Sequence, residues 1–374
     1  MSLNIVVLGL SITSSWGNGH ATTYRALLKA MSARGHSITF LERDVPWYRE
    51  NRDLEHAEYC RIELYDSLPT LARQHGKLIA DADLVILGSY VPDGVAIGEW
   101  LTSRCNGLTA FYDIDTPVTL QGLPNGGVDY LSPRLVPRFD IYLSFTGGPA
   151  LRIVEERFGS PMARALYCSA ELPMEKRTGI PRWSLGYLGT YSEDRQPAVE
   201  ALLLQAARQL PDHAFAIAGS KYPLEIAWPA NVQRMEHLSP AEHPQFYSAQ
   251  RFTLNVTRAD MKAIGFSPSV RMFEAAACGT PLISDEWKGI ETAFKPGVEI
   301  LTAANTKDVV GILTEMSEET RQTIAANARA RFLKDHTAAH RAIQLENYYY
   351  EASANRHSVR THSRQTLHAL QEAK

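Results

Sequence analysis

The stretch between Gly265 and Asp285 holds the residues whose types and spacing best suit a ligand. Ser267 is a natural N-cap residue, and Pro268 suits the first position of a helix, where its missing N–H costs nothing. Gly279 suits a left-handed end to that helix, and a short apolar strand follows. A glycine-bearing loop before a helix N-terminus is an anion site, because unpaired N–H groups and the helix dipole point outward. We therefore predict a loop–helix–strand unit that binds an anion.

Glu274 is an acidic residue inside this otherwise small and apolar helix. A carboxylate one turn into the helix can accept two hydrogen bonds from a ribose diol, which predicts a nucleotide site. The alternative is a surface glutamate that pairs with Arg271, three residues earlier on the same helix. The local pattern leaves both interpretations open.

His20 follows the first apolar run and a turn that contains Gly17 and Gly19. The two glycines permit a tight turn and close approach by a ligand. A neutral imidazole at a helix N-terminus can act as a base or donate to a sugar or a phosphate. The alternative is a capping or buried histidine without chemistry. The glycines do not form the G-x-G-x-x-G pattern, which argues against a dinucleotide site.

Asp113 and Asp115 stand two residues apart at the end of another apolar run. Strand alternation would place both carboxylates on the same side, where they could act as a general base or bind hydroxyl groups. The alternative is a structural aspartate that caps the following turn. Because no third ligand is near in the sequence, we predict no metal site.

Cations follow two strands of the second half, at Lys221 and Arg258, and Tyr191 follows a third. Lysine and arginine at strand ends suit a diphosphate, although solvated surface charge is the alternative. We favour Arg258, because it comes directly before the unit that contains Glu274.

Alternating strands and helices must position these residues. Such alternation is typical of a parallel sheet with helices on both faces, and its loops after the strands bind ligands. We predict one such domain at residues 1–170, a polar linker at 171–184 and a second domain at 185–335. Residues 336–374 are predicted to be helical, either packed back on the first domain or as a frayed tail. The expected strands are residues 4–12, 37–42, 83–90, 108–113, 141–146, 185–190, 214–219, 231–235, 252–256, 281–285 and 299–302.

Composition narrows the class of protein. The chain has 374 residues, which suits two domains, and its formal charge of −3 disfavours a nucleic-acid partner without excluding a local basic groove. No apolar run approaches a membrane span, and the first residues lack the positive region of a signal peptide. The 4 cysteines show no Cys-x-x-Cys spacing. We expect a cytoplasmic bacterial-type enzyme, and its oligomeric state stays open.

These motifs together resemble a known family. Over nearly its full length the chain is similar to the CgeB-type proteins, which are identified as glycosyltransferases, and its second half is similar to the retaining GT-B group. The resemblance implies a GT-B fold, with two Rossmann-like parallel-sheet domains facing an interdomain cleft. It also implies that Glu274 binds the nucleotide ribose. The matching segments are Tyr-Asp-Ile-Asp-Thr-Pro at 112–117, Ser-Phe-Thr-Gly-Gly-Pro at 144–149, Gly-Thr-Tyr at 189–191, Leu-Asn-Val-Thr-Arg at 254–258, Ser-Pro-Ser-Val-Arg at 267–271 and Phe-Glu-Ala-Ala-Ala-Cys-Gly-Thr-Pro at 273–281.

One position departs from the family pattern. The retaining group carries a second glutamate eight residues before the one that matches Glu274, near the donor sugar, and this chain has Phe266 there. The departure leaves the donor sugar and the stereochemistry open. A histidine after the first strand is the base of some inverting GT-B enzymes, so His20 suits either mechanism.

The resulting hypothesis is a metal-independent glycosyltransferase that uses a nucleotide-sugar donor, a UDP- or GDP-sugar, and an unidentified acceptor. A nucleotide-sugar epimerase of the same fold and a non-catalytic nucleotide- or sugar-binding protein are the alternatives. We expect no other cofactor. The predicted catalytic residues are His20, Asp113 and Asp115, and the predicted donor-binding residues are Gly19, Tyr191, Lys221, Arg258, Ser267, Ser269, Arg271 and Glu274.

Overall fold

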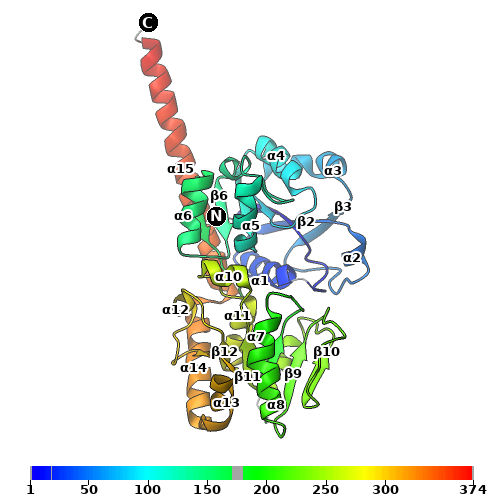
Figure 1. Ribbon diagram of the computed structural model, residues 1–374. Coiled ribbons are helices and arrows are strands. Elements are labelled where there is room, and N and C mark those ends of the chain that lie inside the picture. The colour runs from blue at the N-terminus through cyan, green and yellow to red at the C-terminus, as the bar shows by residue number, and fades with distance from the viewer. Residues whose placement is uncertain (1, 18, 171–179, 373–374) are drawn as a thin grey trace.

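Two α/β domains, each built on a parallel sheet, form the described part of the chain (Figure 1). The computed structural model describes residues 2–17, 19–170 and 180–372, with side chains through residue 356. The N-terminal sheet has the strand order β3-β2-β1-β4-β5-β6-β7, and the C-terminal sheet has the order β10-β9-β8-β11-β12-β13. The predicted architecture of two parallel sheets is confirmed.

The N-terminal sheet is buried on both faces, which explains its nearly continuous apolar strands. In β4 every residue is buried, and alternate side chains enter different hydrophobic clusters, Leu84 and Ile86 on one face and Val85 and Leu87 on the other. The strands are β1 (Asn4–Gly9), β2 (Ser37–Arg43), β3 (Arg61–Tyr65), β4 (Leu84–Gly88), β5 (Leu108–Asp113), β6 (Ile141–Ser144) and β7 (Ala163–Ala165). The helices are α1 (Gly19–Ala33), α2 (Pro46–Arg49), α3 (Leu68–Asp81), α4 (Gly94–Arg104), α5 (Thr116–Gly122) and α6 (Pro149–Phe158).

Two strands of this sheet were not predicted, and both lie at its edges. Strand β3 reads Arg-Ile-Glu-Leu-Tyr and buries only its last residue fully. Strand β7 has three residues, one of them arginine. Edge strands have one neighbour and are partly solvated, so they lack the apolar run that marks a central strand.

The C-terminal domain repeats the alternation. Its strands are β8 (Trp183–Leu188), β9 (Phe215–Ala218), β10 (Val232–Met235), β11 (Gln250–Asn255), β12 (Leu282–Ser284) and β13 (Leu301–Thr302). Its helices are α7 (Gln196–Val199), α8 (Gln205–Gln209), α9 (His243–Ser248), α10 (Ala259–Ile264), α11 (Val270–Cys278), α12 (Ile290–Ala293), α13 (Thr306–Glu315) and α14 (Glu318–Asp335), with a π-helical turn between α7 and α8. Because β8 begins at Trp183, the predicted linker at 171–184 runs two residues too far, and its residues 171–179 lie outside the described part.

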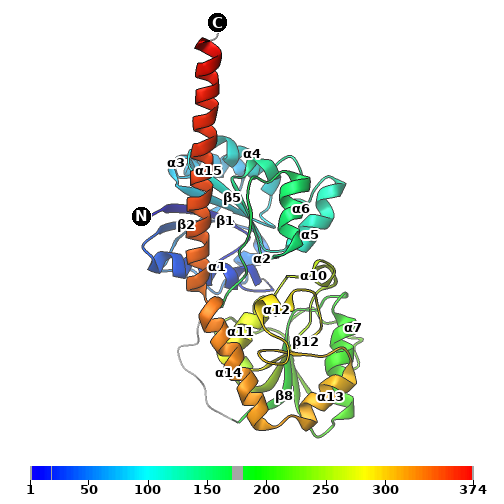
Figure 2. The same cartoon turned by 90° about the vertical axis from the view of Figure 1, so that its left-hand side faces the viewer.

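Helix α15 (Ala338–Glu372) follows α14 and crosses back to the N-terminal domain, where Figure 2 shows it running past the first sheet. Glu346 accepts hydrogen bonds from Arg34, the residue after α1, at 2.6 and 2.7 Å, and lies 2.7 Å from the His36 ring. Tyr348 donates to the main-chain oxygen of Ala165 at 3.0 Å. These contacts tie the start of α15 to the first domain.

Within the described residues, the helices include none that combines the length and the apolar character needed to cross a bilayer.

Candidate functional site

A cavity of about 360 Å³ lies between the two domains, at the carboxyl ends of both sheets. Its N-terminal wall is the loop after β1, the start of α1 and the residues after β5 and β6. Its C-terminal wall is formed by the loops after β8, β9, β10 and β11 and by the start of α11. Ligands of open parallel sheets bind at this edge, so the cavity is the candidate site.

Glu274 lies in the cavity wall, on the second turn of α11, and is only 9% exposed. Its Oε1 is 2.9 Å from His243 Nδ1, and its Oε2 accepts a hydrogen bond from Tyr247 Oη at 3.0 Å. Burial alone would raise the pKa of Glu274, but the charge and hydrogen bond of His243 and the hydrogen bond of Tyr247 lower it overall. Glu274 is therefore ionised at neutral pH, with its remaining lone pairs available to a ligand.

Arg271 does not pair with Glu274, so the interpretation of a surface Glu–Arg pair is wrong. Its Nε donates to the main-chain oxygen of Leu188 at 2.5 Å, and its Nη1 donates to Asn255 Oδ1 at 2.9 Å. The guanidinium also lies over the Tyr187 ring, 4.8 Å from the ring centre. Arg271 is 7% exposed and lines the cavity, where it contributes positive charge.

Gly19 and His20, the first two residues of α1, line the opposite wall. Burial lowers the pKa of His20 to about 4, so its imidazole is neutral at pH 7 and can accept a proton. The His20 ring meets the Tyr90 ring edge-on, with centroids 5.6 Å apart.

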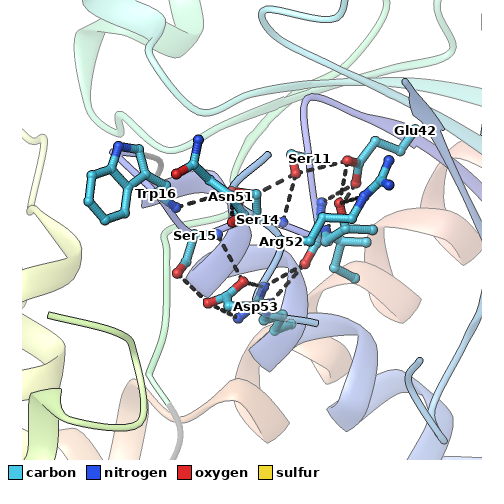
Figure 3. A network of polar contacts seen from close by, with 11 residues as sticks. Ser11, Ser14, Ser15, Trp16, Glu42, Asn51, Arg52 and Asp53 are labelled. Carbon is cyan, nitrogen blue, oxygen red and sulfur yellow. Dashed lines mark hydrogen bonds and ion pairs between the residues drawn. The ribbon is translucent and has the colours of Figure 1, made fainter. Parts of the chain in front are cut away.

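The loop before His20 is held by two acids, the buried Glu42 and the exposed Asp53 (Figure 3). Glu42, which is fully buried at the end of β2, accepts hydrogen bonds from the N–H groups of Ile12 and Thr13 at 2.7 and 3.0 Å. Asp53 accepts from the Ser15 N–H at 3.1 Å and from the Ser15 hydroxyl at 2.5 Å. Carboxylates that accept several hydrogen bonds hold a loop in one conformation. The loop after β1 is therefore well ordered where it lines the cavity.

Asp113, predicted to be catalytic, lies inside the N-terminal domain and not in the cavity wall. It is fully buried and accepts hydrogen bonds from the hydroxyls of Tyr142 and Thr119, the latter at 2.9 Å, and from the Asp115 N–H at 3.2 Å. Burial raises its pKa to about 7. The expectation that both carboxylates share one side is wrong, because β5 ends at Asp113 and strand alternation stops there.

Asp115 does line the cavity, at the N-cap position of α5. Its Oδ2 accepts a hydrogen bond from Arg258 Nη1 at 3.1 Å, across the two domains, and another from Tyr90 Oη at 2.8 Å. Burial raises the pKa of Asp115, and the charge of Arg258 partly offsets this effect. Arg258, the predicted diphosphate ligand, also lines the cavity.

Helix α11 begins two residues later than predicted, with Ser269 as its N-cap residue. Ser267 is 1% exposed, and its hydroxyl is 2.5 Å from Thr146 Oγ1 of the N-terminal domain. Because this bond crosses the domain interface, Ser267 holds the domains together and does not face the cavity. Ser269 lines the cavity and donates to Asn255 Oδ1 at 2.7 Å.

Tyr191 and Lys221, predicted to bind the donor, do not line this cavity. The Tyr191 ring packs edge-on against Tyr222, with centroids 5.6 Å apart. Lys221 has a left-handed backbone, with φ 68°, and its ammonium group lies over Trp47 of the N-terminal domain, 5.7 Å from the ring centre. Both residues follow strand ends, but their side chains contact Tyr222 and Trp47 instead of lining the cavity.

Phe266 lies in the domain interface and not in the cavity wall. A Cβ atom added to Gly148 or to Gly289 would come within 2.6 and 2.4 Å of the Phe266 ring. The ring therefore fills a space that only glycine leaves open on both sides. The Phe266 N–H donates to Lys288 O at 2.7 Å, and its own oxygen accepts from the Gly147 N–H at 2.9 Å.

Sequence reasoning missed His243, Tyr247 and Tyr90. The available signal for the first two was a histidine and a tyrosine four residues apart, which share one face of a helix. Their link to Glu274 is 27 to 31 residues long in sequence, so only the packing of α9 on α11 reveals it. Among the described residues, His, Cys, Asp and Glu side chains form no group of three or more that could hold a metal ion.

Residues 195–347 match a protein family described as glycosyl transferase-like. No curated protein sequence matches the chain. The C-terminal half therefore contains a glycosyl transferase-like domain.

Solved structures of low sequence identity share the whole fold. HepE of Anabaena in complex with UDP-glucose has a TM-score of 0.69 at 13% identity, covering 93% of this chain and 100% of that one. Sucrose-phosphate synthase of Thermosynechococcus elongatus has a TM-score of 0.66 at 15% identity, covering 94% and 100%. An alpha-glucosyltransferase in complex with UDP-glucose and DNA containing an abasic site has a TM-score of 0.69 at 12% identity, covering 94% and 100%. The chain therefore has the GT-B fold of these glycosyltransferases.

Proposed function

We propose that this protein is a glycosyltransferase that moves a sugar from a nucleotide-sugar to an acceptor hydroxyl without a metal ion. The observation that carries the proposal is the position of Glu274. It is a buried, ionised carboxylate in the wall of an interdomain cavity, within the segment that matches the glycosyl transferase-like family. UDP-glucose is the first donor to test, because two proteins of the same fold were solved with it.

The C-terminal domain would bind the nucleotide. Glu274 accepts hydrogen bonds from the two ribose hydroxyls, while His243 and Tyr247 keep its carboxylate in place. The diphosphate lies between Arg258 and the N-terminus of α11, where Ser269 and Arg271 reach the cavity. Negative charge grows on the diphosphate as the bond to the sugar breaks, so cations and helix N–H groups placed there stabilise the transition state.

The N-terminal domain would bind the acceptor and receive its proton. The neutral His20 imidazole and the Asp115 carboxylate are the bases on this wall. The acceptor oxygen bonds to the anomeric carbon as its proton passes to one of these bases. The bond from that carbon to the diphosphate oxygen breaks, and its electron pair leaves with the nucleoside diphosphate. Closure of the two domains excludes water, which limits hydrolysis of the donor.

A thermal-shift screen against nucleotide-sugars tests the donor class. A ligand at 100 times its dissociation constant adds about 2.7 kcal/mol to the free energy of unfolding, which is readily measured. We expect a UDP- or GDP-sugar to stabilise the protein and to be slowly converted to free nucleoside diphosphate. Conversion to an isomeric nucleotide-sugar without any acceptor would instead identify an epimerase. The absence of both stabilisation and turnover with every nucleotide-sugar would contradict the proposal.

A further inference from the structure

Arg258 and Asp115 form an ion pair across the interdomain cavity. Arg258 comes directly before α10 of the C-terminal domain, and Asp115 comes directly before α5 of the N-terminal domain. Their Nη1 and Oδ2 atoms are 3.1 Å apart, and both residues line the cavity. The cation that best suits a diphosphate is therefore already paired with an acid of the opposite domain.

Asp115 has a second support that does not depend on Arg258. Tyr90 Oη donates to the same carboxylate oxygen at 2.8 Å. Tyr90 has φ 63°, a left-handed conformation that is rare for an aromatic residue. Its ring packs against Tyr130, with centroids 4.6 Å apart, which holds the side chain in this position. Backbone strain of this kind persists only where the surrounding structure maintains it, and it is frequent at functional sites.

Repulsion between two negative groups prevents Arg258 from pairing with Asp115 and with a diphosphate at the same time. The diphosphate of a nucleotide-sugar is strongly anionic, and it would meet the Asp115 carboxylate as a like charge. Asp115 is largely buried, with a side chain that is 14% exposed, so water screens this repulsion only weakly. The carboxylate must therefore move away from Arg258 when the diphosphate arrives.

We propose that Arg258 exchanges Asp115 for the donor diphosphate, and that this exchange frees the Asp115 carboxylate for the acceptor. Asp115 keeps its hydrogen bond from Tyr90, next to His20, so it stays on the acceptor wall. This inference rests on the proposed function, to which it adds the group that the donor diphosphate displaces from Arg258.

Asp194 is a second acid near Arg258, and the proposed exchange leaves it in place. Its Oδ2 is 3.8 Å from Arg258 Nε and accepts a hydrogen bond from the Ala259 N–H at 3.0 Å. Asp194 belongs to the same domain as Arg258 and does not line the cavity. A diphosphate in the cavity therefore displaces Asp115 and not Asp194.

Calorimetric titration of the wild-type protein and two variants tests the exchange. The probes are UDP and GDP, with uridine and guanosine as matched ligands that lack the diphosphate. Asp115→Asn removes the competing charge and keeps the side-chain shape. Tyr90→Phe is the control, because it removes the other hydrogen bond to the same oxygen and leaves the charge. Unchanged affinity for the nucleoside shows that each variant keeps a folded nucleotide site.

We expect Asp115→Asn to bind the preferred nucleoside diphosphate about fivefold more tightly, the range of one partly exposed ion pair, with no change for the nucleoside. Tyr90→Phe should bind both ligands within about twofold of the wild type, because it leaves the ion pair intact. Equal or weaker binding of the diphosphate by Asp115→Asn would overturn the exchange while leaving the proposed function intact. Failure of the wild type and of Asp115→Asn to bind UDP or GDP would overturn the proposed donor class, and the exchange with it.

Discussion

The imidazole of His243 and the carboxylate of Glu274 are joined by a 2.9 Å hydrogen bond in the wall of the interdomain cavity. Burial alone would lower the pKa of His243, but the charge and hydrogen bond of Glu274 raise it overall. The same contact lowers the pKa of Glu274. Glu274, which we propose binds the ribose, is thus held in its ionised form by His243 of α9 before any nucleotide binds.

Replacement of Glu274 tests its contact with the ribose. Glu274→Gln should weaken binding of UDP or GDP by about tenfold to a hundredfold, because hydrogen bonds to a charged group contribute about 1.5–3 kcal/mol. Titration with the nucleotide and its 2′-deoxy form checks the cause, since the wild type alone should discriminate between them. Glu291→Gln, at an exposed position outside the cavity, is the matched control. Undiminished affinity in Glu274→Gln would show that the ribose lies elsewhere.

The pair should also contribute a pH-dependent part of the stability. Because the folded state raises the pKa of His243, its contribution is complete below the unfolded value of about 6.5 and is lost as the pH rises through the folded value. Glu274, whose pKa is lowered, contributes above about 4.5 and loses its contribution in stronger acid. His243→Gln should therefore lower the free energy of unfolding by about 2 kcal/mol near pH 5.5, and by less at higher pH.

Urea unfolding between about pH 5 and 8.5 measures this difference. His56→Gln is the control, because His56 is exposed. A difference between wild type and His243→Gln that grows with pH would contradict the assignment.

Glu346 should anchor α15 to the first domain. Its contribution to the free energy of unfolding should depend on pH over a different range from that of the His243–Glu274 pair. Its hydrogen bonds with Arg34 and His36 hold the pKa of Glu346 at about 2. Glu346→Gln should lower the free energy of unfolding by about 1 kcal/mol at pH 7, the upper range for a partly exposed pair. The loss should shrink as the pH falls below about 4.5, where the unfolded carboxylate binds protons first. Urea titrations at several pH values check this, with the exposed Glu319→Gln as the control.

Phe266→Glu should not improve the enzyme, although it matches the pattern of the retaining GT-B group that the sequence resembles. The new carboxylate would lie in the domain interface between Gly148 and Gly289, outside the cavity. We expect a loss of about 2 kcal/mol in the free energy of unfolding, because an unpaired charge replaces a packed ring. Phe266→Leu keeps an apolar side chain and should cost less. Higher donor affinity in Phe266→Glu would show that position 266 reaches the donor after all.

A chelator should leave nucleotide binding unchanged. Arg258 and Arg271 line the cavity and supply positive charge at the proposed diphosphate position, so we expect nucleotide binding to need no divalent cation. Titration of UDP or GDP in EDTA and in magnesium should give the same dissociation constant. A tenfold weaker affinity in EDTA, about 1.4 kcal/mol, would contradict the metal-independent proposal.

Much of the fold could be predicted because its signals are local. The apolar runs of β1, β4 and β5 and the glycine after α11 depend on neighbours within a few residues. The edge strand β3 escaped prediction because half-solvated strands lack that signal. Within the site, His20 could be singled out because it follows a glycine-containing turn. Glu274 could be singled out because it is an acid within an otherwise small and apolar helix.

The sequence by itself determined the two parallel sheets, the cavity edge that their loops share, and the presence of Glu274 on a well-ended helix. The tertiary structure alone decided which of two neighbouring acids faces the cavity. Asp113 turns inward and Asp115 outward, because the strand ends between them. The tertiary structure also decided which side chains pair, since Arg258 donates a hydrogen bond to Asp115, 143 residues away in sequence. Periodicity and capping act over a few residues, whereas such contacts arise only when the domains pack together.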